Sequence, residues 1–130
     1  SSDLACDHAP HARTDKEVEF AYASSGISGL ETSLGLSLAL VSDGTLSWSK
    51  LVEKMSTNPA RILNLPKGTL APGANADITV IDPILRWTVN VDTFRSRGKN
   101  SPFGGWILQG RAVLTLVGGD AKYVSDSFKI

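Results

Sequence analysis

Near its start the chain reads Leu4-Ala5-Cys6-Asp7-His8-Ala9-Pro10-His11. The apolar run that begins this stretch predicts a buried β-strand over residues 3–7, and polar side chains follow where that strand would end. In parallel α/β folds the active site lies at the carboxyl ends of the strands. The stretch therefore predicts one strand of such a fold with a candidate site directly after it.

The next segment, residues 12–26, carries mixed charge. Thr14 and Glu17 have the spacing of a helix capping box, which predicts one helical turn. The rest of the segment has the character of a loop.

Apolar periodicity predicts helices in the middle of the chain. Leucines recur every four positions over residues 30–41, which indicates a largely buried helix that ends at Asp43-Gly44. Ser47 is expected to cap a second helix. Asn58-Pro59 is expected to cap and start a third, which would run to about Leu65.

After Lys67-Gly68 the pattern changes to short β-branched runs separated by turn residues. These runs predict a small antiparallel β-layer built from residues 69–81 and 87–124. The chain is therefore expected to be an α+β structure with a boundary near Leu65.

Composition excludes several classes of function. The chain has 130 residues, in which 13 basic residues balance 13 acidic ones, so the positive charge of a nucleic-acid binder is missing. No apolar run approaches the ~20 residues of a membrane span. Cys6 is the single cysteine and no export signal is recognised, which favours a cytoplasmic location.

Asp7, His8 and His11 place one carboxylate and two imidazoles within five positions. A carboxylate can bind a divalent cation and also act as a base, so this group is a candidate catalytic site. The alternative is that Asp7 caps a turn while both histidines lie at the surface. The supply of metal ligands is small, because a catalytic zinc takes three protein ligands and the chain has only two histidines and one cysteine.

Two motifs resemble the dihydroorotases, amidohydrolase-superfamily enzymes of pyrimidine biosynthesis. The narrower signature is Asp7-His8-Ala9-Pro10-His11 followed by Gly29-Leu30-Glu31-Thr32, and Asn100-Ser101-Pro102-Phe103 is close to the same pattern. A second motif, Asn58-Pro59-Ala60-Arg61-Ile62 with a later Ala76-Asp77, is found across the superfamily, including enzymes that act on hydantoins, dihydropyrimidines and allantoin.

This resemblance implies a fold. Residues 1–65 would be the last strand, active-site loop and helices of a TIM-type (β/α)₈ barrel, and residues 66–130 a small antiparallel β-sandwich-like domain. Dihydroorotases take metal ligands from a His-x-His pair and from other barrel strands, none of which lies in these residues. The chain is therefore expected to be the C-terminal portion of a larger enzyme and to be inactive by itself.

The resemblance also implies roles for individual residues. Asp7 would contact the metal centre, one or two zinc ions in the parent enzyme, and would carry the proton. His11 would bind the substrate's carboxylate. Gly26, with Ser25 before it, matches the loop whose main chain contacts the substrate ring. His8 is a candidate for supporting Asp7 or for packing at the barrel mouth rather than for ligation.

The reaction implied is the reversible cyclisation of N-carbamoyl-L-aspartate to L-dihydroorotate. A hydantoinase-like or allantoinase-like cyclic amidohydrolase is the alternative of the same class. A non-catalytic interaction segment is the alternative of another class, and it would pair with itself as a homo-oligomer or with a complementary barrel fragment.

Outside the candidate site, Glu31 is expected to interact with its own helix N-terminus. Arg95, Arg97 and Lys99 are expected to be a solvated cluster.

Overall fold

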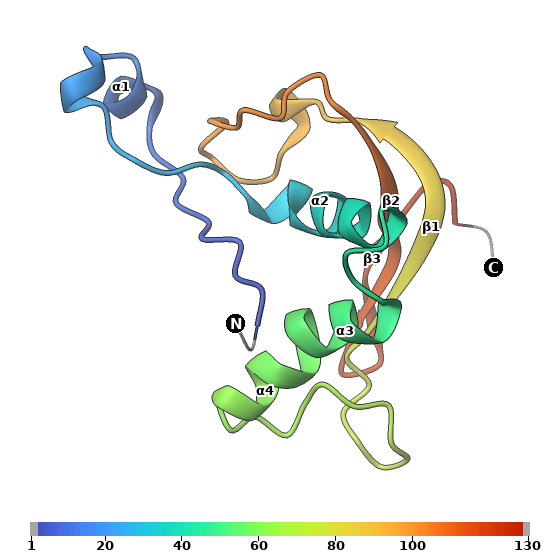
Figure 1. Ribbon diagram of the computed structural model, residues 1–130. Coiled ribbons are helices and arrows are strands. Elements are labelled where there is room, and N and C mark those ends of the chain that lie inside the picture. The colour runs from blue at the N-terminus through green and yellow to red at the C-terminus, as the bar shows by residue number, and fades with distance from the viewer. Residues whose placement is uncertain (1–2, 129–130) are drawn as a thin grey trace.

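The computed structural model describes residues 3–128 and places most of its helical elements before a three-stranded sheet (Figure 1). The helical elements are α1 (Arg13–Lys16), η1 (Phe20–Tyr22), α2 (Leu30–Ser42), α3 (Trp48–Val52), η2 (Glu53–Thr57), α4 (Asn58–Ile62) and η3 (Val91–Thr93). The strands are β1 (Ile78–Thr88), β2 (Ile107–Val117) and β3 (Asp120–Val124).

The sheet is antiparallel, with β2 between β1 and β3. Its register pairs Ile78 with Leu116 and Thr88 with Ile107, and it is interrupted between Asp82 and Arg86. Pro83 lies in this interruption, as expected for a residue without an N–H to donate. The predicted antiparallel layer is confirmed, although it begins at Ile78 rather than at residue 69. Residues 3–128 form one such sheet, so a sandwich-like arrangement is not confirmed.

The core lies between α2 and the sheet. Val89, Phe94 and Leu108 form a buried cluster, against which Leu36 and Trp87 pack. At Gly35 of α2, a Cβ would lie 3.0 Å from Leu108 Cδ1, so the helix approaches β2 closely because it has no side chain there. The helical half and the strand half of the chain therefore share one core.

The helix predictions are confirmed in part. The helix expected over residues 30–41 is α2, and Ser47 caps α3 by accepting a hydrogen bond from the Lys50 amide at 3.2 Å. The prediction that Asn58 caps a separate third helix is wrong. Thr57 before it is already helical, because the π-helical turn η2 joins α3 to α4, and α4 ends at Ile62 instead of Leu65.

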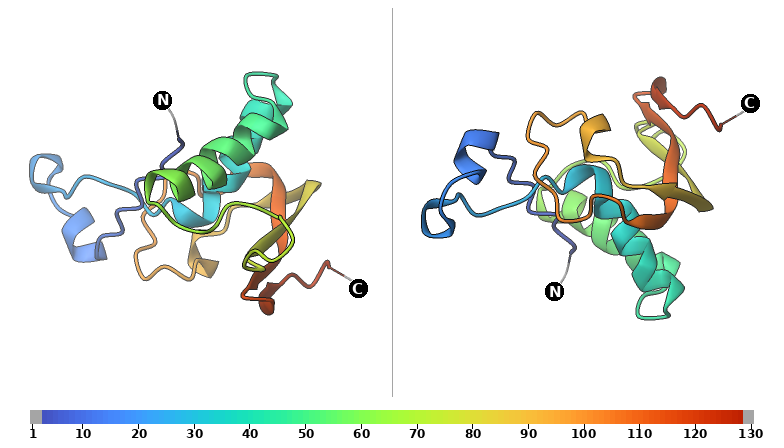
Figure 2. Two further views of the ribbon diagram at one scale, coloured as in Figure 1. Left: turned by 90° about the horizontal axis from the view of Figure 1, so that it is seen from below. Right: turned by 90° about the horizontal axis from the view of Figure 1, so that it is seen from above.

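Residues 12–26 form an excursion that extends away from the rest of the molecule in two views (Figures 1 and 2). The single helical turn expected there is α1. It starts after Ala12 without a side-chain cap, so the capping role expected of Thr14 is wrong. Phe20 is 95% exposed and Tyr22 79% exposed at the outer end of the excursion.

The expected strand over residues 3–7 is not formed. These residues have no regular secondary structure, and the segment contributes only one parallel bridge, between His8 and Ile27. A parallel strand is stable only when neighbouring strands bond it along its length. Among residues 3–128, the segment around Ile27 offers it a single bridge.

The chain exposes much more surface than a compact domain of its mass. Its accessible area is 8,927 Å², whereas a folded monomer of 13.8 kDa exposes about 6,600 Å². Large apolar side chains contribute to the difference, including Ile84 at 75% and Leu63 at 66% exposure. Within residues 3–128, no helix has the length and apolar character that crossing a bilayer requires.

Asp77 of the superfamily motif fixes the start of the sheet. Its carboxylate accepts hydrogen bonds from Lys67 Nζ at 2.5 Å and from the Gly118 amide at 2.8 Å. The Lys67 ammonium, and after it the Gly118 amide, lower the pKa of this carboxyl group. Asp77 thus ties the loop before β1 to the turn between β2 and β3.

Replacing Gly110 tests how tightly α2 packs on the sheet. Gly110 has φ +87°, and a Cβ there would overlap Cδ1 of Leu38, which is buried. Gly73 has nearly the same φ, +85°, but open space around it. We expect Gly73→Ala to cost about 1 kcal/mol of unfolding free energy through backbone strain. We expect Gly110→Ala to cost roughly 1–3 kcal/mol more, as measured by urea unfolding. Equal losses would contradict this account.

Candidate functional site

The candidate site is built where residues 6–9 lie beside residues 26–29. The Ala9 amide donates a hydrogen bond to the Ile27 carbonyl at 2.9 Å. A Cβ at Gly26 would lie 2.6 Å from the Ala9 Cβ, and a Cβ at Gly29 would lie 2.9 Å from the Cys6 carbonyl oxygen. The two backbones approach this closely only because both positions are glycine.

His8 binds the N-terminus of α2. Its Nδ1 accepts hydrogen bonds from the Gly29 amide at 3.0 Å and the Leu30 amide at 3.3 Å. Gly29, at the N-cap, has no side chain to do this. An Nδ1 that accepts carries no hydrogen, so the ring hydrogen lies on Nε2. His8 therefore acts as a helix cap supplied from a distant segment, while its predicted support of Asp7 stays a prediction.

Asp7 is exposed and has φ +44°, a left-handed conformation that is uncommon outside glycine. Such backbone outliers concentrate at functional sites. Within residues 3–128, no three His, Cys, Asp or Glu side chains converge as a metal-binding group. The described residues by themselves therefore do not fit a zinc site with three protein ligands.

His11 lies with the loop residues that were predicted to accompany it. Its Nε2 is 2.8 Å from the Ser25 carbonyl oxygen, so Nε2 carries the hydrogen and donates. Gly26 follows with φ +120°, and a Cβ there would lie 3.4 Å from the same Nε2. The structure thus brings His11, Ser25 and Gly26 together. Between residues 3 and 128, it shows no hydrogen bond from Asp7 to this group.

Two further side chains hold the same loop. Lys16 Nζ donates to the carbonyl oxygens of Ser24 at 2.5 Å and Gly26 at 3.1 Å. Asn100 Nδ2 donates to the Gly26 carbonyl at 2.8 Å. The sequence interpretation missed both residues. Lys16 lies in a segment of mixed charge, where nothing distinguished it from its neighbours. Asn100 was noted only as part of a motif, without a role of its own.

The loop that contains Asn100 is bound to the site through its backbone. The Ser28 amide donates to the Asn100 carbonyl at 2.6 Å, and the buried Ser28 hydroxyl donates to the Gly98 carbonyl at 2.5 Å. A Cβ at Gly98 would lie 2.7 Å from Pro10 Cβ. Residues 98–100 therefore form part of the site although they lie far along the chain.

Glu31 does not have the partner expected of it. Its Oε1 accepts a hydrogen bond from the Ser96 amide at 3.0 Å, so Glu31 holds the 95–99 loop rather than its own helix N-terminus. The solvated cluster expected in that loop is confirmed for Arg95 and Arg97, which are exposed, but Lys99 donates to the Phe94 carbonyl.

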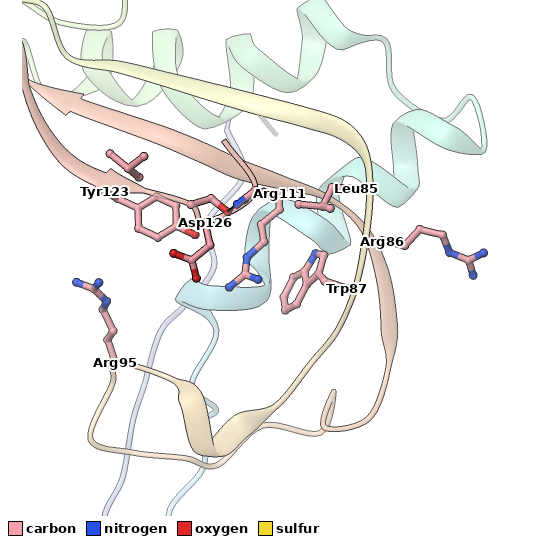
Figure 3. A pocket seen from close by; sticks show the side chains of 10 residues that line it. Leu85, Arg86, Trp87, Arg95, Arg111, Tyr123 and Asp126 are labelled. Atoms are coloured by element: carbon pink, nitrogen blue, oxygen red, sulfur yellow. Dashed lines mark hydrogen bonds between the residues drawn. The ribbon is translucent and has the colours of Figure 1, made fainter. Parts of the chain in front are cut away.

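A cavity of about 550 Å³ lies elsewhere, along the sheet and the segment after β3 (Figure 3). Its lining includes Trp87, Arg95, Arg111, Tyr123 and Asp126, and the Arg111 guanidinium lies 4.8 Å from the centre of the Trp87 ring. None of the predicted site residues lines this cavity. The cavity and the predicted site are thus separate features.

Comparisons with known proteins agree with the fold. A model described as "Amidohydrolase family" matches residues 4–122. The dihydroorotase of Syntrophus aciditrophicus (strain SB) is 62% identical over 123 residues, 95% of this chain and 29% of that protein. The structure of dihydropyrimidinase from Brevibacillus agri NCHU1002 has a TM-score of 0.88 at 26% identity, covering 98% of this chain and 29% of that one.

A third relative is L-hydantoinase (dihydropyrimidinase) from Arthrobacter aurescens, whose structure has a TM-score of 0.77 at 36% identity and covers 86% of this chain and 26% of that one. The chain therefore spans 26–29% of the length of these three relatives.

Substitution of His8 tests its role as a helix cap. His8→Ala removes the acceptor for two amides of α2, and we expect a loss of about 1 kcal/mol in unfolding free energy. The amide oxygen of His8→Asn replaces Nδ1 as acceptor, so this control should recover most of that loss. Equal destabilisation by both variants in urea unfolding would contradict the cap.

Proposed function

Because the chain belongs to the amidohydrolase family, we propose that it carries part of the active site of a dihydroorotase, which interconverts N-carbamoyl-L-aspartate and L-dihydroorotate. The observation that carries the proposal is the hydrogen bond from His11, four residues after Asp7, to the Ser25 carbonyl, which brings His11 beside Ser25 and Gly26. The 62% identity to a protein named dihydroorotase supports it.

In this proposal Asp7 moves the proton. Ring closure joins the carbamoyl nitrogen to the side-chain carboxyl carbon and releases water. The Asp7 carboxylate takes the proton from the attacking nitrogen and passes it to the departing oxygen, and solvent supplies the second proton with which that oxygen leaves as water. In ring opening Asp7 returns the proton to the ring nitrogen. Its exposed position, at the end of the segment beside Gly26 and Gly29, is compatible with access to a substrate.

His11 and the loop bind the substrate. His11 recognises the ring carboxylate, and the main chain at Ser25 and Gly26 contacts the ring. When both ring nitrogens carry hydrogen, His11 donates from Nε2 to the Ser25 carbonyl and from Nδ1 to the carboxylate. A site built to bind a carboxylate discriminates against uncharged ring analogues, because its donor would be left unpaired.

Membership of the family implies metal dependence in general. We propose zinc as the metal, with Asp7 as one ligand and the other ligands from outside residues 3–128, since these residues do not form a site alone. The isolated chain is accordingly proposed to be inactive. We place the reaction in the cytoplasm, as the single cysteine suggests.

Hydantoinase-like ring opening is the second candidate, favoured by the structural likeness to L-hydantoinase at 36% identity. Hydantoins and dihydropyrimidines lack the ring carboxylate that His11 would bind. The two reactions can therefore be distinguished by whether substrate binding depends on His11. An interaction role is the remaining candidate, and the exposed apolar side chains support it.

Activity can be tested in a chimera in which this chain replaces the matching 123 residues of the Syntrophus aciditrophicus dihydroorotase. We expect turnover of dihydroorotate by the chimera. Asp7→Asn should lower kcat by about 10²–10⁴-fold, the contribution typical of a positioned acid–base group. An inactive but folded chimera, or full activity of Asp7→Asn, would contradict the proposal.

His11→Ala in the same chimera tests substrate choice. Loss of a hydrogen bond to a charged group costs about 1.5–3 kcal/mol, so KM for dihydroorotate should rise roughly 10- to 100-fold. Turnover of hydantoin, which has no carboxylate, should fall less than turnover of dihydroorotate, because hydantoin loses only the hold of His11 on the Ser25 carbonyl. An unchanged KM for dihydroorotate, or hydantoin as the better substrate of the unsubstituted chimera, would favour the hydantoinase-like reaction.

A further inference from the structure

Three consecutive peptide carbonyls, those of Ser24, Ser25 and Gly26, are each held by a side chain from another segment. Lys16 bonds the first and third, His11 bonds the second, and Asn100 also bonds the third. The Gly26 carbonyl thus has two donors. We call residues 24–26 the clamped segment.

This arrangement sets the direction of the amide groups. The structure has no cis peptide bond, and in a trans peptide the N–H points opposite to the C=O. Lys16 and Asn100 therefore turn the amide of Ile27 by fixing the Gly26 carbonyl, and Lys16 turns the amide of Ser25 by fixing the Ser24 carbonyl. Within residues 3–128, the Ser25 and Gly26 amides have no hydrogen-bond acceptor.

The clamped segment gains no rigidity from regular secondary structure. It lies between η1 and α2, and Gly26 at φ +120° has the conformational freedom of glycine. Lys16 and Asn100 are half-buried, so their hydrogen bonds are partly shielded from water. Four side-chain hydrogen bonds, together with the bond from the Ser24 amide to the Asp15 carbonyl, therefore hold this backbone in place.

We propose that Lys16 and Asn100 are positioning residues for the substrate ring, acting through the main chain of the clamped segment. The proposal rests on the proposed function, in which that main chain contacts the ring. Neither side chain touches the substrate. Both bond the Gly26 carbonyl, and Lys16 also bonds the Ser24 carbonyl, so they act by fixing the main chain that contacts the ring.

The proposal predicts an effect on binding rather than on chemistry. Main-chain contacts to the ring are made in the ground state and in the transition state alike, so their loss raises KM and leaves kcat nearly unchanged. Lys16 and Asn100 share the Gly26 carbonyl, so their effects should not be independent. A residue that only stabilised the fold would lower the active fraction and hence kcat, without raising KM.

The experiment measures KM and kcat for dihydroorotate in the chimera with Lys16→Met, Asn100→Leu and the double variant. We expect KM to rise about tenfold in each single variant. The rise in KM of the double variant should be smaller than the product of the two single rises. Lys16→Arg should restore KM, because it keeps a cation that can donate. Lys50→Met is the matched control, because Lys50 pairs with Glu53 on the exposed surface of the helical region.

Unchanged KM in Lys16→Met, or a fall in kcat alone, would overturn the proposal. Amide hydrogen exchange of residues 25–27 in the 130-residue chain provides a second measurement. Lys16→Met and Asn100→Leu should accelerate exchange at Ile27 at least severalfold, and no acceleration would count against the clamp. An inactive unsubstituted chimera would contradict the proposed function, while the exchange experiment would still decide whether the two side chains position this backbone.

Discussion

The close approach of two backbones, residues 6–9 and residues 26–29, is the constraint on which the site depends. Hydrogen at the Cα of Gly26 and Gly29 leaves room for Ala9 and for the Cys6 carbonyl. This contact allows His8 to reach the start of α2 and His11 to reach the Ser25 carbonyl. A Cβ at either glycine would lie closer than 3.0 Å to the facing segment, so the present approach requires that neither position has a side chain.

Features encoded by local pattern were predictable. The leucine spacing of α2 and the cap at Ser47 depend on neighbouring residues, and both were found where the sequence indicated. Features that need a distant partner were not. The strand expected over residues 3–7 lacks neighbours along its length, and the Glu31 carboxylate is bound by the Ser96 amide, 65 positions away.

The same division applies to the candidate site. Asp7, His8 and His11 could be named because they stand together in a motif, whereas Lys16 and Asn100 meet only in three dimensions. Asn100 belongs to the loop that links the sheet to the site, and it bonds a carbonyl 74 positions earlier. The predicted boundary near Leu65 remains a prediction, yet hydrogen bonds join the two sides of it at residues 28 and 100.

The excursion that contains α1 is closed at its base. The Ser24 amide donates to the Asp15 carbonyl at 3.0 Å, and the adjacent Lys16 side chain returns to the Ser24 carbonyl. Residues 17–23 therefore lie beyond a base that these two hydrogen bonds close. Changes of length or sequence in this tip, for instance around the exposed Phe20, are therefore expected to leave the hydrogen bonds of the candidate site in place.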